Sequence, residues 1–219
     1  MKKNVIFIAI VLVVVSAGFF AFNQFFRQSQ HQASDQDAPR IESKELVKDH
    51  SPSMGPKDAS VQVVEFLDPE CEACKMMDPI VKGLIKSYEG RVLYVVRYML
   101  FHGNSLLAAV SLEEAREQGK YWEALSTLFY NQPEWGDHHN PKPELIATYL
   151  IKLGIDSGSL KEESLLTKHR WKVDLDQADG KKFGVKSTPS FFVNGKMLPE
   201  IGYEPLKAAI DSALAQAKK

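Results

Sequence analysis

Residues 61–85 read VQVVEFLDPECEACKMMDPIVKGLI, and this stretch decides the fold. Residues 61–67 are apolar and rich in β-branched side chains, which predicts a buried strand. Residues 75–85 have the apolar spacing of a helix. Cys71 is therefore expected where a strand passes into a helix N-terminus, and the unpaired N–H groups and helix dipole there stabilise a thiolate.

The chain has only two cysteines, Cys71 and Cys74. A disulfide between them closes a very short ring, and such a ring adds little to folding stability. A structural zinc site needs four ligands, but the chain has no second C-x-x-C, and His138 and His139 are adjacent in a polar stretch. Two inert buried cysteines are disfavoured because the polar Glu72 lies between them. The pair therefore predicts redox chemistry, with no metal and no cofactor.

The N-terminus is apolar from Val5 to Phe22 after Met1-Lys2-Lys3. Such a run is just long enough to span a bilayer, and the lysines favour a cytoplasmic N-terminus. We expect residues 1–26 to form an uncleaved single-pass anchor in the inner (cell) membrane. The alternative is a signal peptide cleaved near residues 16–18, which would leave a soluble periplasmic protein. Either way the body lies on the periplasmic or extracytoplasmic side, where disulfides persist.

The composition divides the rest of the chain into two parts. Residues 27–60 are rich in Gln, Ser, Asp, Pro and Lys, which predicts a flexible linker. Residues 61–219 are long enough for one domain with its own core. The formal net charge is −1 and no basic stripe appears, so nucleic acid is not an expected partner.

The order of elements predicts an α/β domain. A second strand at 91–100 follows the first helix, and strand, helix and strand in that order form a parallel βαβ unit. Three helical stretches then form an inserted subdomain at about residues 104–170. Residues 190–198 predict a hairpin whose Asn-Gly turn at 194–195 is typical of type I′. A last helix is expected at about residues 204–218.

This order resembles the thioredoxin fold, and local matches support the resemblance. The sequence CEACKMMDPI at 71–80 is similar to the thioredoxin active-site helix, and Pro79 matches the position where family members kink that helix. Thr188-Pro189, just before the hairpin, matches the family's cis-proline, which faces the cysteines. Glu65, six residues before Cys71, matches the buried acid beneath the redox pair.

The inserted helices and the exported setting resemble the DsbA-type branch of this family. The anchor and the run Phe101-His102-Gly103 are most similar to its membrane-anchored, BdbD-like members. Two positions depart from the pattern. Glu72-Ala73 replaces the Pro-His or Pro-Ser of many family oxidants, and Glu70 replaces the tryptophan of thioredoxins.

The resemblance implies an exported thiol–disulfide oxidoreductase that exchanges disulfides with client proteins through a mixed disulfide. It implies Cys71 as the nucleophile and Cys74 as the resolving thiol. Glu65 would move a proton to or from Cys74. Thr188 and Pro189 would bind an extended client segment by strand addition. A membrane redox partner would reset the pair.

A second class of function remains open from the sequence. A thioredoxin-fold copper-binding or chaperone module would use Cys71 and Cys74 as soft ligands for Cu(I). Met76, Met77 and His102 are compatible with copper, but no Met-rich run or histidine cluster adjoins the motif. His102 is itself either a proton donor near the site or a structural residue.

The acidic residues around the motif give an expectation about its redox tuning. Asp68, Glu70 and Glu72 surround Cys71 in sequence, and like charge disfavours a thiolate. We therefore expect a disulfide that is a weaker oxidant than that of histidine-containing DsbA-type proteins.

Overall fold

The computed structural model describes residues 18–20, 22–23, 40–88 and 90–217, in two units, Met1–Pro39 and Arg40–Lys219. The described residues of the first unit, 18–20 and 22–23, are helical. Most of the predicted anchor or signal peptide at 1–26 lies outside the described residues. Among the residues that are described, no helix combines the length and the apolar character needed to cross a membrane.

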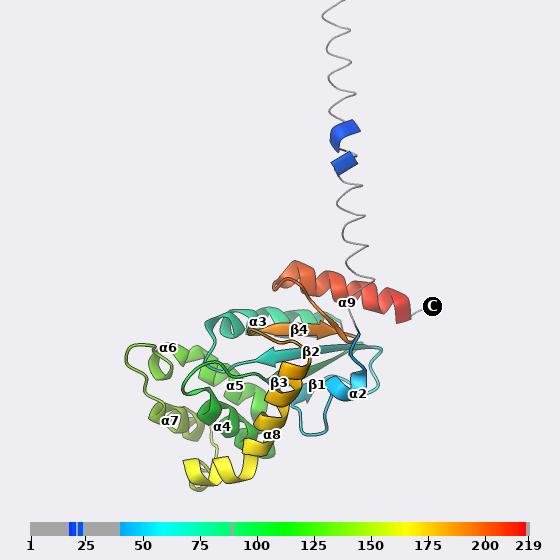
Figure 1. The fold of residues 1–219 in the computed structure, drawn as a ribbon. Helices are drawn as coiled ribbons and strands as arrows, with labels where there is room; N and C mark the ends of the chain where they lie inside the picture. Colours follow the sequence, from blue (N-terminus) through cyan, green and yellow to red (C-terminus); the bar gives the residue numbers. More distant parts are fainter. Residues whose placement is uncertain (1–17, 21, 24–39, 89, 218–219) are drawn as a thin grey trace, which may run out of the picture. The chain divides into compact units, whose positions relative to one another are not determined.

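The second unit is built on a five-stranded sheet with the order β1-β3-β2-β4-β5 (Figure 1). The central strand β2, Val61–Leu67, pairs in parallel with β3, Val92–Tyr98, and antiparallel with β4, Ser190–Val193. The edge strand β5, Lys196–Met197, completes the hairpin with β4, and β1, Ser53–Met54, pairs antiparallel with β3. The predicted parallel strand pair and the predicted hairpin are confirmed.

Helices cover both faces of the sheet, and six of the seven residues of β2 are therefore buried. Helices α3, Glu72–Ser87, and α9, Tyr203–Ala217, pack on one face (Figure 1). Helix α2, Ser43–Leu46, and the last turns of α8, Glu162–Lys182, pack on the other. Gly180 favours the close approach of α8, because a Cβ there would lie 3.1 Å from Cε1 of Phe66.

The helical subdomain lies between β3 and β4. It contains α4 (Ser105–Glu117), α5 (Tyr121–Tyr130), α6 (Gln132–Trp135), α7 (Glu144–Lys152), a short 3₁₀ turn (Ser157–Ser159) and α8. Helices α4, α5 and α7 agree with the three predicted helical stretches. The sequence pattern did not predict α8. Because of this helix, the helical subdomain continues to Lys182, past the expected end near residue 170. The buried face of α8 includes His169, Lys172 and Asp176, and polar residues at buried positions weaken the apolar periodicity.

The second half of the predicted linker is part of the folded unit. Leu46 is 1% exposed, and the backbone N–H of Ile41 donates to the Gly195 carbonyl at 2.9 Å. The fully buried guanidinium of Arg97 donates to the Leu46 carbonyl at 3.0 Å. Residues 40–60 are thus held by a buried leucine, by backbone hydrogen bonds and by the guanidinium of Arg97, which the composition of the segment does not reveal.

Candidate active site

The two cysteines lie at the start of α3 but are buried to different depths. Cys71 is the N-cap residue in an extended conformation, with φ −77° and ψ 124°, and Cys74 lies in the first turn. Cys71 is 8% exposed and Cys74 only 1%. Neither is in a disulfide, and in its protonated form the Cys71 Sγ donates to the Thr188 carbonyl at 3.3 Å. One sulfur therefore lies at the rim and the other beneath it.

Hydrogen bonds at the helix start separate the two thiol pKa values. The largest effect on the pKa of Cys71 is a hydrogen bond with Cys74, which lowers it, whereas burial raises it. Further hydrogen bonds with the Thr188 side chain and with the backbone of Ala73 and Cys74 bring the pKa of Cys71 to about 5. Burial raises the pKa of Cys74 far above its usual range, and the hydrogen bond to Cys71 and the charge of Glu65 raise it further. At neutral pH, Cys71 is therefore a thiolate and Cys74 a protonated thiol.

Thr188 reaches Cys71 from the loop before β4, and Pro189 follows it in the chain. The bond between them is cis, as the family pattern predicts. Both residues are buried, Thr188 at 9% exposure. Because the Thr188 carbonyl contacts Cys71, this loop and the helix start form one surface.

Glu65 is a buried acid on β2, at 2% exposure. Its carboxylate accepts a hydrogen bond from the Tyr94 hydroxyl of β3. Burial raises the pKa of Glu65 to about 8, although the Tyr94 hydrogen bond opposes the shift. The charges of Asp78 and Cys71 raise the same pKa, so Glu65 is electrostatically coupled to the redox pair. It holds its proton at neutral pH.

The acidic residues next to Cys71 are engaged by donors from other elements. Asp68, fully buried, accepts from the Phe101 backbone N–H and from the His102 ring, both at 2.7 Å. Glu70 accepts from the backbone N–H of Asn104 at 2.7 Å, just before α4 begins. The three carboxylates were expected to disfavour the Cys71 thiolate, but the pKa of Cys71 is lowered nonetheless.

Three contacts of this site were missed or left open by the sequence analysis. Tyr94 was not predicted as a partner of Glu65, although the register places Glu65 opposite Val96, two residues along β3. The pairing of His102 with Asp68 joins residues 34 positions apart, and no local pattern encodes it. His138, predicted only as a loop residue, reaches the exposed Glu72 at 2.7 Å.

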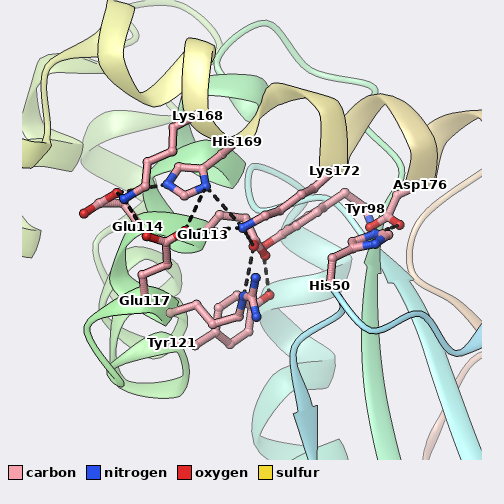
Figure 2. A network of polar contacts seen from close by, with 11 residues as sticks. His50, Tyr98, Glu113, Glu114, Glu117, Tyr121, Lys168, His169, Lys172 and Asp176 are labelled. Atoms are coloured by element: carbon pink, nitrogen blue, oxygen red, sulfur yellow. Dashed lines mark hydrogen bonds and ion pairs between the residues drawn. The ribbon is translucent and has the colours of Figure 1, made fainter.

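A second polar cluster lies between α4 and α8, away from the cysteines (Figure 2). Glu114, Glu117 and His169 form the only group of three potential metal ligands among the described residues. The Lys168 ammonium lies 2.9 Å from Glu114 and 2.5 Å from Glu117. Because that ammonium already pairs with both carboxylates, we interpret the group as a structural ion-pair network.

Comparison with known proteins agrees with this geometry. A family model described as Thioredoxin matches residues 47–212, and the chain therefore belongs to the thioredoxin family. The predicted family and fold are confirmed. The chain is 30% identical to the probable disulfide bond formation protein D of Bacillus cereus over 169 residues, which cover 74% of this chain and 78% of that protein.

Other relatives are longer proteins. The chain is 34% identical to the Na(+)/H(+) antiporter NhaA 3 of Salinispora tropica over 170 residues, 75% of this chain but 25% of the antiporter. It thus spans about a quarter of the length of such relatives. Among solved structures, oxidised BdbD from Bacillus subtilis superposes with a TM-score of 0.71 at 26% identity, covering 82% of this chain and all of that one.

Proposed function

We propose that this protein is an exported thiol–disulfide oxidoreductase that exchanges disulfides with client proteins through Cys71 and Cys74. The observation that carries the proposal is the asymmetry of the pair. Cys71 is a low-pKa thiolate at the rim of the site, whereas Cys74 is a high-pKa thiol beneath it. Nucleophile and resolving thiol need these two environments. The similarity to a probable disulfide bond formation protein supports the same reading.

In the oxidising direction, a client thiolate attacks the Cys71 sulfur of the Cys71–Cys74 disulfide. The S–S bond breaks, and its electron pair leaves on Cys74, which takes a proton. A second client thiolate then attacks the client sulfur of the mixed disulfide, and Cys71 leaves as a thiolate. Two electrons pass from the client to the pair. The reducing direction runs through the same steps in reverse.

Glu65 is suited to supply the proton that Cys74 takes. Its pKa of about 8 keeps it protonated at neutral pH while leaving the proton transferable. The charge of Glu65 raises the pKa of Cys74, which supports this role. Tyr94 holds the carboxyl group in place.

Thr188 and Pro189 are suited to bind the client. The Thr188 carbonyl already contacts Cys71, so an extended client segment beside this loop would bring its own sulfur to the nucleophile. Backbone hydrogen bonds of this kind are a form of strand addition and require no particular client sequence.

The copper-binding or chaperone alternative receives no such support. In the described part of the chain, the only cluster of three potential metal ligands lies between α4 and α8 and contains neither cysteine. Ion transport is not proposed either, because the chain matches only about a quarter of the antiporters.

For the location, we propose a single-pass anchor at residues 1–26 that holds the domain on the extracytoplasmic side, where a membrane redox partner resets the pair. The support is the apolar run from Val5 to Phe22 after two lysines. Fractionation and the mass of the mature chain test it. A shortened chain in the soluble exported fraction would instead indicate a cleaved signal peptide.

The test of the function is trapping of clients. Cys74→Ala should accumulate mixed disulfides, because Cys71 still attacks a client disulfide but no thiol releases it. Cys71→Ala should trap few, because Cys74 is buried and protonated. Non-reducing gels with and without reductant report the adducts. Equal trapping by both variants would contradict the assigned roles.

A further inference from the structure

The turn that carries Cys71 has an unusual balance of charge. Asp68, Glu70 and Glu72 precede or follow the nucleophile, and no basic residue lies between the cysteines. Cys71 nevertheless has a depressed pKa. Two histidines from other elements contact its acidic residues: His102, after β3, pairs with Asp68, and His138, after α6, pairs with Glu72.

Asp68 fixes the position of His102. The His102 Nδ1 lies 2.7 Å from Oδ2 of Asp68, which is fully buried and also accepts from the Ser105 hydroxyl at 2.5 Å. The backbone carbonyl of Asp68 accepts from the Cys71 N–H at 3.1 Å. The same residue thus anchors the cysteine turn and orients the imidazole, with the His102 side chain 26% exposed at the rim.

The groups facing His102 are mostly acidic. They are Asp68 and Glu70 from the turn, Cys71 at the N-cap of α3, Glu72 in its first turn, and His138, whose ring centroid lies 5.9 Å away. Burial alone would lower the pKa of His102, but the hydrogen bond and charge of Asp68 raise it, and the Cys71 thiolate raises it further. This surrounding charge favours the imidazolium.

Coupling between two titrating groups is reciprocal. If a thiolate at Cys71 favours a proton on His102, the imidazolium favours the thiolate by the same free energy. The arrangement therefore has an oriented cation, a nucleophile and a buried carboxylate that fixes both.

We propose that His102, oriented by Asp68, is a positioning residue that supplies positive charge to the Cys71 thiolate and so favours the reduced form of the pair. This rests on the proposed function and deepens it. In the last step of client oxidation the electron pair leaves on Cys71, and His102 stabilises the sulfur that receives it. His138 is more exposed and pairs with Glu72 instead.

The test is the ultraviolet absorbance of the thiolate against pH in the reduced full-length protein. His102→Gln removes the charge and should raise the measured pKa of Cys71 by about one unit, a tenfold loss of thiolate at acidic pH. His102→Lys restores a positive charge and should recover most of that loss. His139→Ala, an exposed neighbour of His138, is the matched control and should change nothing.

Two outcomes would overturn the proposal. In the first, His102→Gln leaves the pKa of Cys71 unchanged. In the second, His102→Gln and His102→Lys raise that pKa equally, which would mean that packing and not charge causes the effect. Circular dichroism checks that each variant is folded; Asp68→Asn is avoided because Asp68 is buried among several donors. Disulfide exchange between the wild-type protein and glutathione is measured separately. Its absence would contradict the proposed function while leaving the charge coupling testable by titration.

Discussion

Two buried glutamates in this protein have opposite properties. Glu65, on the central strand β2, is 2% exposed and has a pKa raised to about 8. Glu114, between α4 and α8, is 4% exposed and has a pKa lowered to about 2. Burial alone raises both values. The difference comes from their partners.

The partner of Glu65 is the neutral hydroxyl of Tyr94, which leaves most of the desolvation cost of the charged form uncompensated. Glu114 instead lies 2.9 Å from the Lys168 ammonium and 2.9 Å from the His169 ring (Figure 2). Hydrogen bonds from these residues and from Gln118 more than offset its burial. Glu114, compensated by its partners, stays charged and connects two helices. Glu65, uncompensated, keeps a proton that it can transfer.

Breaking the compensation in the α4–α8 network should give the largest effect on stability. The Lys172 ammonium lies 2.9 Å from Glu113, which is fully buried. Lys172→Met keeps the aliphatic packing but leaves a buried carboxylate without its closest buried cation. We expect a loss of about 3–5 kcal/mol in the free energy of unfolding, measured by urea denaturation.

The double variant Glu113→Gln/Lys172→Met is the matched control. Removing both charges leaves no uncompensated ion, so the double variant should recover at least half of the loss. Arg116, which also pairs with Glu113, is part-exposed and can be solvated. If the double variant loses as much free energy of unfolding as its two single substitutions do in sum, charge compensation does not hold the network together.

The same contrast explains how much the sequence predicted. Strand β2, helix α3, the hairpin and α9 were predicted closely because their buried positions are apolar and their turn residues are specific, as at Asn194-Gly195. Asn194 and Gly195 both have positive φ, 44° and 85°, as a type I′ turn requires. Local rules were sufficient for these elements.

Local rules failed where buried positions are polar. Helix α8 buries His169, Lys172 and Asp176. Their partners lie on α4, on β3 and, for Asp176, also at His50 before β1. Such residues look like solvent-exposed ones until the tertiary structure supplies the opposite charge. The cysteines, the cis-proline and Glu65 were predicted from a family pattern, but the contact between Asp68 and His102 was not, because it depends on how two loops meet.

Replacing Glu65, the acid whose burial is not compensated, should have a smaller effect on the free energy of unfolding, and this effect should be a gain instead of a loss. The folded protein holds the Glu65 proton up to about pH 8, whereas an unperturbed glutamate releases it near pH 4.5. The unfolded chain therefore binds fewer protons in this window, and the contribution of Glu65 to stability falls as the pH rises. Glu65→Gln carries no ionisable proton and escapes this fall, while its amide oxygen can still accept from Tyr94.

We therefore expect Glu65→Gln to gain stability relative to the wild type as the pH rises from about 5 to 7, by on the order of 2 kcal/mol. Urea unfolding at several pH values measures it, with Glu123→Gln as an exposed control. The comparison with the wild type cancels the other titrating groups, including Glu114, whose stabilisation is lost only as the pH falls from 4.5 toward 2. A pH-independent difference would mean that Glu65 ionises in the folded state much as it does in the unfolded chain. It would then be no better placed than a surface carboxylate to deliver a proton to Cys74.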